Sequence, residues 1–329
     1  MRELDRRALF GALGAVVTAA PSGTMADNLG GWPLRPVRVV VPFAPGGPTD
    51  IYARLMAEHL GRTFGQPFVV ENRAGATGSV GTMLVARAAP DGHTLLFPSS
   101  SSYVIAPLVL RDAGFDPLKD FLPVSLVANC PFYMLASPAM PVRSVAEFVA
   151  FARERPGRLN FSSPGVGSAG HFVAELFLHR AGIQAVHVPF NGAAPSVTAV
   201  AAGDVQFAFD TVGTAQPLVA EGRIRGLALT GARRMDVVAE VPTLAEAGFE
   251  GFDAALWVGL LAPVGTPSAI IEAMNAAIDR LLVTPEARAR IAAAGYEPGG
   301  GPPGAMQRRI LEETRVWGEV KRVAGIQAA

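Results

Sequence analysis

Residues 37–50 read Val-Arg-Val-Val-Val-Pro-Phe-Ala-Pro-Gly-Gly-Pro-Thr-Asp, and this stretch decides the fold. The run 37–42 is apolar apart from Arg38, and four of its six residues are the β-branched Val, which predicts a strand buried on both faces. The spacing of apolar residues then predicts a helix over 49–63, ended by Gly65. A buried strand, a short glycine-rich loop and an amphipathic helix make the repeating unit of an α/β protein with a parallel sheet.

The same unit recurs along the chain. Strands are predicted at 67–71 and 94–97, with a helix at 79–89 between them. The alternation restarts later, with predicted elements at 144–152, 159–162, 168–180, 185–189, 194–202, 205–210 and 224–230. No flexible linker separates the two units. We therefore predict two α/β domains joined by crossover strands, with 123–128 and 224–230 as the candidates.

Composition excludes several function classes. Of 329 residues, 50% are hydrophobic and 17% are charged, which suits a folded chain long enough for two domains. Lys and Arg together number 28, as do Asp and Glu, so no net charge would attract nucleic acid or an anionic membrane. The single cysteine, Cys130, lies in an apolar stretch and is expected to be a small buried side chain rather than a nucleophile.

The first 26 residues have the layout of an export signal. Arg2, Arg6 and Arg7 precede an uncharged apolar run over 9–20, which is too short to span a bilayer as a stable helix. Residues 24–26 offer small side chains at the two positions that a signal peptidase reads. We predict that residues 1–26 are a signal peptide, removed on export to the periplasm by the Sec or the twin-arginine route.

Loops that follow strands are the candidate binding loops, because ligands of open α/β sheets bind beyond the carboxyl ends of the strands. Amides at a helix N-terminus, approached closely where glycine has no side chain, favour a carboxylate. Asp50 either caps the helix that follows it or contacts an amine on the ligand. The candidate ligand-binding residues are Phe43, Ala44, Pro45, Gly46, Gly47, Thr49, Asp50, Ser100, Ser163, Gly165, Val166, Gly167, Ser168, His171, Phe190, Asn191, Gly192 and Asp210. We expect the amides of Gly46, Gly47, Gly167 and Ser168 to bind the carboxylate.

Residues 165–170 contain a literal GxGxxG, so a dinucleotide-dependent oxidoreductase has to be weighed. That fingerprint also requires an acidic residue at the end of the next strand, to hold the ribose. The next predicted strand ends at 188–191, Val-Pro-Phe-Asn, with no acid nearby. The loop is therefore better suited to a small anion than to a dinucleotide.

Motifs for catalysis are sparse. The sequence has no GxSxG elbow, no Walker loop and no cluster of Cys and His at metal-ligand spacing. We therefore predict a binding protein that catalyses nothing and requires no cofactor or metal.

Taken together, the loops resemble a known family, the receptors of tripartite tricarboxylate transporters, also called the Bug family. The resemblance runs from about Trp32 to the C-terminus and rests on residues 37–50, 69–75, 88–95, 161–168, 188–192, 241–246 and 262–267. Departures are Pro48, where the family commonly has a small residue, and Asn191, where a Lys is frequent.

The resemblance implies a type II periplasmic-binding-protein fold with a ligand cleft between two lobes. It places residues 27–127 and 230–329 in the first lobe and residues 128–229 in the second. It also implies a monomer that captures a small carboxylate (a dicarboxylate, an amino acid or an aromatic acid) for the membrane permease subunits of a tripartite transporter. A ligand sensor for a membrane signalling partner stays open as an alternative, because the sequence does not separate transport from signalling.

Overall fold

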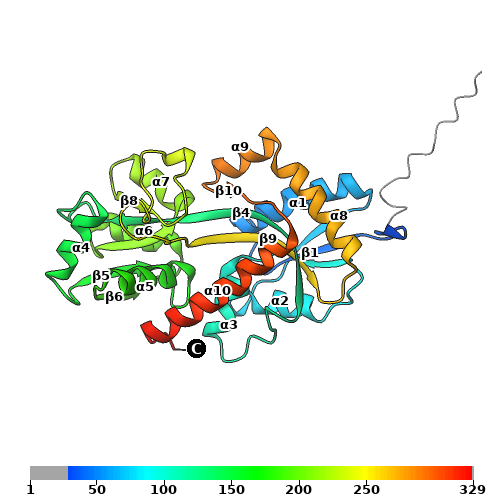
Figure 1. Cartoon of the computed structure of the whole chain (residues 1–329), viewed down its shortest axis with the longest axis horizontal. Helices are drawn as coiled ribbons and strands as arrows, with labels where there is room; N and C mark the ends of the chain where they lie inside the picture. The colour runs from blue at the N-terminus through cyan, green and yellow to red at the C-terminus, as the bar shows by residue number, and fades with distance from the viewer. Residues whose placement is uncertain (1–28, 328–329) are drawn as a thin grey trace, which may run out of the picture.

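The computed structural model describes residues 29–327, so the predicted signal peptide, residues 1–26, lies outside the described chain. Figure 1 shows two lobes side by side, connected by long extended segments. Each lobe is a sheet covered by helices, and the expected two-lobed α/β architecture is confirmed.

The first lobe is built around β1 (Val37–Val41), which pairs in parallel with β2 (Phe68–Asn72) and with β3 (Thr94–Leu96). Its valines are at most 1% exposed. Val39 and Val41 pack in one apolar cluster with α1 (Pro48–Phe64) and α8 (Ser268–Leu282), whereas Val40 packs on the opposite face with α2 (Ser79–Ala86). Burial on both faces explains why this strand has no polar alternation.

The second lobe is built around β5 (Leu159–Ser163), which pairs in parallel with β6 (Ala185–Pro189) and β7 (Phe207–Thr211). Aromatic side chains fill its core, and the ring centroids of Phe148 and Phe207 lie 4.9 Å apart. The helices of this lobe are α4 (Val145–Arg153), α5 (Ala169–Ala181), α6 (Ala193–Ala202) and α7 (Val212–Ala220).

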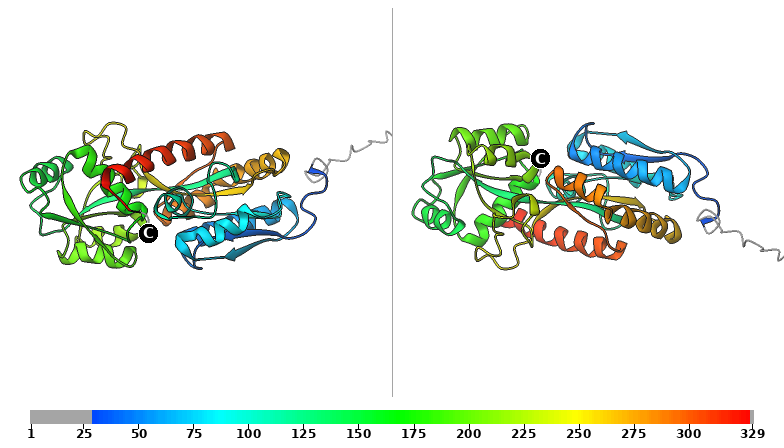
Figure 2. Two further views of the ribbon diagram at one scale, coloured as in Figure 1. Left: turned by 90° about the horizontal axis from the view of Figure 1, so that it is seen from below. Right: turned by 90° about the horizontal axis from the view of Figure 1, so that it is seen from above.

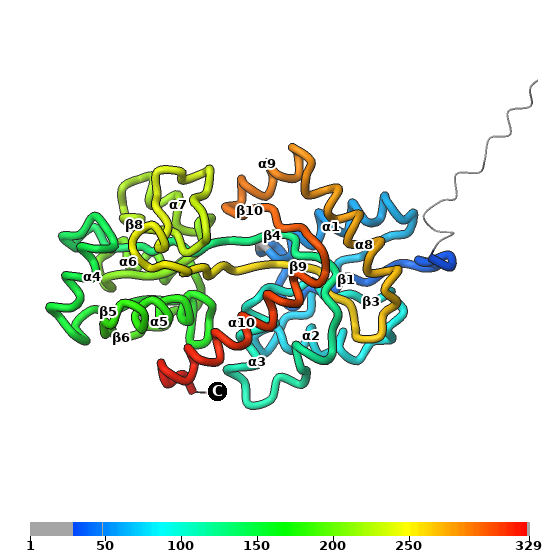
Figure 3. The backbone as a smooth tube through the Cα atoms, in the orientation of Figure 1, coloured from blue at the N-terminus to red at the C-terminus, as the bar shows by residue number. Residues whose placement is uncertain are grey.

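The chain passes between the lobes on two long antiparallel strands, β4 (Phe121–Ala136) and β9 (Ala255–Pro263) (Figure 3). The predicted crossover at 123–128 lies within β4. The second predicted crossover, 224–230, is wrong: it forms β8 (Arg225–Leu229), which pairs with β4 inside the second lobe. The following segment packs back on that lobe, since the Leu244 amide bonds to the Leu229 carbonyl. A buried strand has the same local pattern whether or not it crosses between lobes.

The C-terminal helix α10 (Pro303–Ala324), which was not predicted from the sequence, lies against both lobes (Figure 2). Trp317 meets Phe172 of α5 edge-to-face, with ring centroids 6.1 Å apart. The remaining elements are η2 (Ala76–Gly78), η3 (Ser101–Ile105), α3 (Ala106–Val109), η4 (Asp236–Val238), α9 (Pro285–Ala293) and β10 (Glu297–Pro298).

Candidate functional site

A cavity of about 330 Å³ lies between the lobes. Both crossover strands contribute to its wall, through Phe132 of β4 and Leu256 of β9. The other lining residues are Phe43, Gly47, Thr49, Ser99, Ser101 and Tyr296 from the first lobe, and Pro164, Ser168, Ala169, Gly170, Ala193, Asp210, Thr211 and Thr214 from the second. Hollows of about 500 and 560 Å³ lie elsewhere on the molecule, but neither is bordered by the predicted binding loops.

Helices α1, α5, α6 and α7 begin at this cavity, so their N-termini converge on it from both lobes. Within residues 29–327, the backbone N–H groups of Gly47, Ala169, Gly170 and Ala193 donate to no acceptor. Unbonded amides at helix N-termini carry a partial positive charge and bind anions. The cavity therefore offers a carboxylate several donors from opposite sides.

The cavity wall holds no cationic side chain among its described lining residues, and Asp210 is the one charged residue there. Hydroxyl groups of Ser and Thr supply most of the remaining polar lining. A carboxylate in this cavity would thus be neutralised by backbone dipoles and hydroxyl groups rather than by Lys or Arg.

The first predicted loop is held together by Asp50. The carboxylate accepts hydrogen bonds from the Gly46 amide at 2.9 Å, from Arg54 Nη2 at 2.9 Å and from Asn72 Nδ2 at 2.9 Å. Burial alone would raise the pKa of Asp50, but the hydrogen bonds from Arg54, Gly46 and Asn72 lower it below its usual value. Both carboxylate oxygens and the Gly46 amide are therefore used within the loop, contrary to the expectation that Gly46 is free.

The second predicted loop is also bonded internally. The Gly167 amide donates to His171 Nδ1 at 3.2 Å, and the Ser168 amide donates to the Gly165 carbonyl at 3.1 Å. The His171 ring stacks on His187, with centroids 3.8 Å apart, and burial together with the nearby His171 lowers the pKa of His187 to about 4. Gly167 and Ser168 were expected to present free amides. The free donors are instead those of the next two residues.

Five of the predicted binding residues line the cavity: Phe43, Gly47, Thr49, Ser168 and Asp210. The others do not line it: Ala44, Pro45, Gly46, Asp50, Ser100, Ser163, Gly165, Val166, Gly167, His171, Phe190, Asn191 and Gly192. Their positions explain this. Val166 is 64% exposed, Ser100 Oγ accepts the Trp257 amide, and Gly192 is the N-cap of α6, so that the next residue reaches the cavity.

Sequence reasoning missed Phe132, Leu256 and Tyr296, which give the cavity most of its large apolar surface. They belong to the crossover strands and to the segment before β10, far in sequence from the glycine loops. No local pattern distinguishes them from core residues. Thr214 could have been found, because it lies in the first turn of the helix that follows the predicted residue Asp210.

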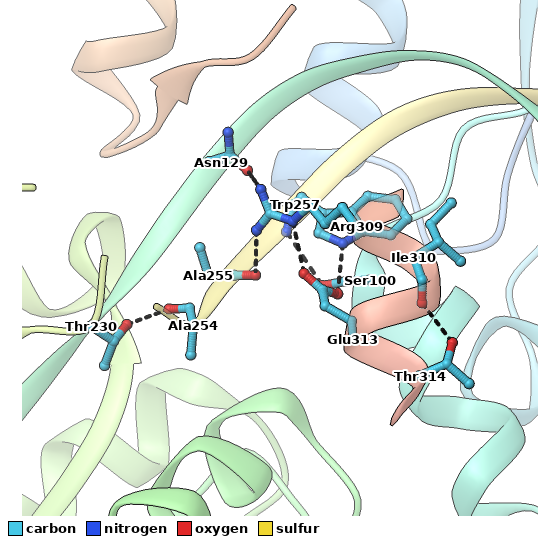
Figure 4. Close-up of polar contacts among 10 residues, drawn as sticks. All are labelled: Ser100, Asn129, Thr230, Ala254, Ala255, Trp257, Arg309, Ile310, Glu313 and Thr314. Atoms are coloured by element: carbon cyan, nitrogen blue, oxygen red, sulfur yellow. Dashed lines mark hydrogen bonds and ion pairs between the residues drawn. The ribbon is translucent and has the colours of Figure 1, made fainter. Parts of the chain in front are cut away.

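Helix α10 binds both crossover strands through a polar network beside the cavity (Figure 4). The Glu313 carboxylate accepts from Trp257 Nε1 at 2.8 Å and from Arg309 Nε at 2.8 Å. Arg309 in turn donates to Asn129 Oδ1 of β4 at 2.5 Å and to the Ala255 carbonyl of β9 at 3.5 Å. Burial raises the pKa of Glu313, although Arg309 opposes the shift. The network fixes the two strands to one helix where they leave the second lobe.

Two further features of the described chain bear on function. Between residues 29 and 327, no three His, Cys, Asp or Glu side chains are grouped as a metal ion would require. In the same range no helix has both the length and the apolar character needed to cross a bilayer.

The chain is similar to known proteins over most of its length. Residues 52–326 match the family described as "Tripartite tricarboxylate transporter family receptor". Protein BugT of Bordetella pertussis is 35% identical over 295 residues, which cover 89% of this chain and 90% of BugT.

Solved structures agree with this similarity. Rpa4515 of R. palustris, solved with adipate, superposes with a TM-score of 0.77 at 38% identity, covering 91% of this chain and 100% of that one. MatC from Rhodopseudomonas palustris, solved with malate, superposes with a TM-score of 0.72 at 35% identity, covering 88% and 99%. The chain therefore belongs to the tripartite tricarboxylate transporter receptor family, whose members are periplasmic solute-binding receptors and not enzymes.

Proposed function

We propose that the protein captures a small carboxylate in the cavity between its lobes and delivers it to the permease subunits of a tripartite transporter. The observation that carries this proposal is the convergence of unbonded helix N-terminal amides from both lobes on a cavity whose described lining residues include no cation. Relatives solved with adipate and malate support the same ligand class. Export through cleavage of residues 1–26, and action as a monomer, belong to the same proposal.

The proposed mechanism is closure of the lobes on the ligand. Three contacts between the lobes support it: Gly167 packs on Val109, Gly213 packs against the turn at Ala294, and Arg233 pairs with Glu297 at 2.9 Å. Donors from opposite lobes bind one ligand only when the lobes are closed, so the ligand shifts the population towards the closed state.

We propose lobe boundaries close to those implied by the family. We place the first boundary inside β4 near residue 128, the position that the family implies. For the second we favour the start of β9, Ala255, rather than residue 230. The packing of Val238 in one apolar cluster with Leu229 supports this revision.

The ligand class is tested by thermal unfolding and calorimetry against a panel of mono- and dicarboxylates. A bound carboxylate at one hundred times its Kd should stabilise the protein by about 2.7 kcal/mol. Nicotinamide dinucleotides should leave the unfolding temperature unchanged. Stabilisation by a dinucleotide, with every carboxylate inactive, would overturn the proposal.

The amide donors are tested by Ala169→Pro. Ala169 is the first residue of α5, a position where proline is tolerated, and the preceding Ser168 already has the extended backbone that proline requires (φ −70°, ψ 158°). The variant removes one free N–H. Losing a hydrogen bond to a charged group is worth about 1.5–3 kcal/mol, so we expect Kd to rise about 10- to 150-fold.

Ser268→Pro is the matched control, because it places proline at the same position of α8, at an exposed residue that does not line the cavity. Its affinity should equal that of the wild type. If Ala169→Pro bound the carboxylate within twofold of the control, the amides of α5 would not be part of the site.

A further inference from the structure

Asp210 is an acid in the cavity wall that the carboxylate-binding scheme does not use. It lies in β7, one residue before its end and two before the start of α7, and is 3% exposed. Its Oδ1 accepts the Thr211 amide at 2.7 Å, whereas its Oδ2 has no hydrogen-bond partner among residues 29–327. A buried carboxylate oxygen without a donor is an unfavourable arrangement unless something else supplies one.

The described protein supplies no counter-charge to this acid. Burial raises the pKa of Asp210 to about 6; hydrogen bonds from the Thr211 amide and from the Thr211 and Thr214 hydroxyl groups oppose that shift, but no cation does. The neighbouring titratable groups, Cys130 and Tyr296, are themselves buried with raised pKa values and stay neutral at physiological pH. Among the described residues that line the cavity there is no cation to pair with Asp210, so the cavity can accept one from its ligand.

We infer that the ligand is an amino-carboxylate, whose carboxylate binds the helix N-terminal amides and whose protonated amine binds Asp210. This inference rests on the proposed function and narrows its ligand class. The ligand would then match the cavity at both ends: amides and hydroxyl groups face its anion, and the Asp210 carboxylate in the cavity wall accepts from its cation. A plain dicarboxylate would instead bring a second negative charge into a cavity whose one charged group is already an anion.

The sequence pointed to Asp50 as a possible amine contact. That residue is excluded, because Arg54, Asn72 and the Gly46 amide occupy both of its carboxylate oxygens. Asp50 and Asp210 are both buried acids beside a glycine loop or helix start. They differ in the hydrogen-bond donors that lie beside each carboxylate, since Asp50 has a cation, Arg54, among its donors.

The test uses pairs of probes that share a carbon skeleton and differ in one amine, measured by calorimetry on the wild-type protein at pH 7.5. Suitable pairs are succinate with aspartate, adipate with 2-aminoadipate, and 4-methylbenzoate with 4-(aminomethyl)benzoate. In the pair that binds most tightly, we expect the amine-bearing member to bind at least tenfold more tightly than the member without the amine. This comparison requires no variant, so it does not depend on how a substitution affects folding.

Asp210→Asn then assigns the preference to this residue. The variant should lose the tenfold preference, mainly through weaker binding of the amine-bearing probe. Asp204→Asn, the same change at an exposed position of the same lobe, should keep it. The unfolding temperature of each variant, measured without ligand, shows that it is folded.

The outcomes separate this inference from the proposed function. If plain carboxylates bind and no amine-bearing probe binds more tightly, the inference is wrong and the proposed function stands. If no carboxylate binds with or without an amine, the proposed function itself fails. If the preference exists but survives in Asp210→Asn, the amine binds elsewhere and the role given to Asp210 is wrong.

Discussion

Gly213 is the position where a single methyl group should test whether the lobes close on the ligand. It lies in the first turn of α7, in the second lobe, against the turn that follows α9 in the first lobe. A Cβ atom at Gly213 would lie 2.6 Å from the Ala294 carbonyl oxygen, whereas ordinary contacts begin at 3.4 Å. Gly213→Ala therefore requires the lobes to separate by roughly 0.8 Å at this point or the backbone to deform.

The expected effect on ligand affinity depends on whether the added methyl group strains the open or the closed state. Overpacking by one methyl group costs about 1–3 kcal/mol, and here it arises only when the lobes are closed. The closed population falls accordingly, so the apparent Kd should rise about 5- to 150-fold. The unfolding temperature without ligand should be equal to that of the wild type or slightly higher, since Ala favours a helix over Gly.

Calorimetry with the tightest carboxylate of the panel measures the effect, and Gly318→Ala is the matched control. Gly318 lies in α10, where an added Cβ would have no neighbouring atom within 4 Å. Affinity should be unchanged in the control. A Gly213→Ala protein that binds within twofold of it would refute the reasoning that closure brings these two surfaces together.

Three further outcomes follow from the buried groups. Because the pKa of Asp210 is raised from 3.8 to about 6, the ligand-free wild type should lose stability relative to Asp210→Asn as pH rises from 4 to 7, by roughly 2 kcal/mol in urea unfolding. Glu313→Ala leaves Arg309 without its partner and should lower the free energy of unfolding by about 2–4 kcal/mol, whereas Glu312→Ala, which breaks an exposed pair, should leave it nearly unchanged. Cys130 is fully buried and its pKa is raised to about 12, so a thiol reagent should modify it only after unfolding.

The network of Arg309 and Glu313 gives the crossover region a defined structure. Strands that carry a hinge must bend at a fixed place if closure is to bring the same groups together each time. Here α10 bonds to β4 at Asn129 and to β9 at Ala255, so one helix holds the two strands together at these residues.

The local sequence was sufficient to predict many of the helices and strands, and to identify the loops that border the cavity. The apolar run at β1 and the Ser168 cap of α5 follow from short-range preferences that hold in any context. The loops after these strands were identified because the end of a parallel strand is where ligands bind. Phe43, Gly47 and Asp210 could therefore be predicted as cavity residues from the sequence alone.

The three-dimensional structure decided which groups in those loops are available. Gly46 and Gly167 have the same local character as Gly47 and Gly170, but their amides are bonded to Asp50 and His171. Both bonds join residues four apart in the sequence, so the conformation of each loop, rather than its composition, determines which amides stay unbonded.

The apolar wall and the state of Asp210 were also decided by the tertiary structure. Phe132 and Leu256 reach the cavity because β4 and β9 cross between the lobes, which no short stretch of sequence records. Asp50 and Asp210 have identical side chains, and their different roles come from the donors that the fold places around each of them. The sequence predicted a carboxylate site between the two units, and the packing of distant segments determined which atoms line the cavity there.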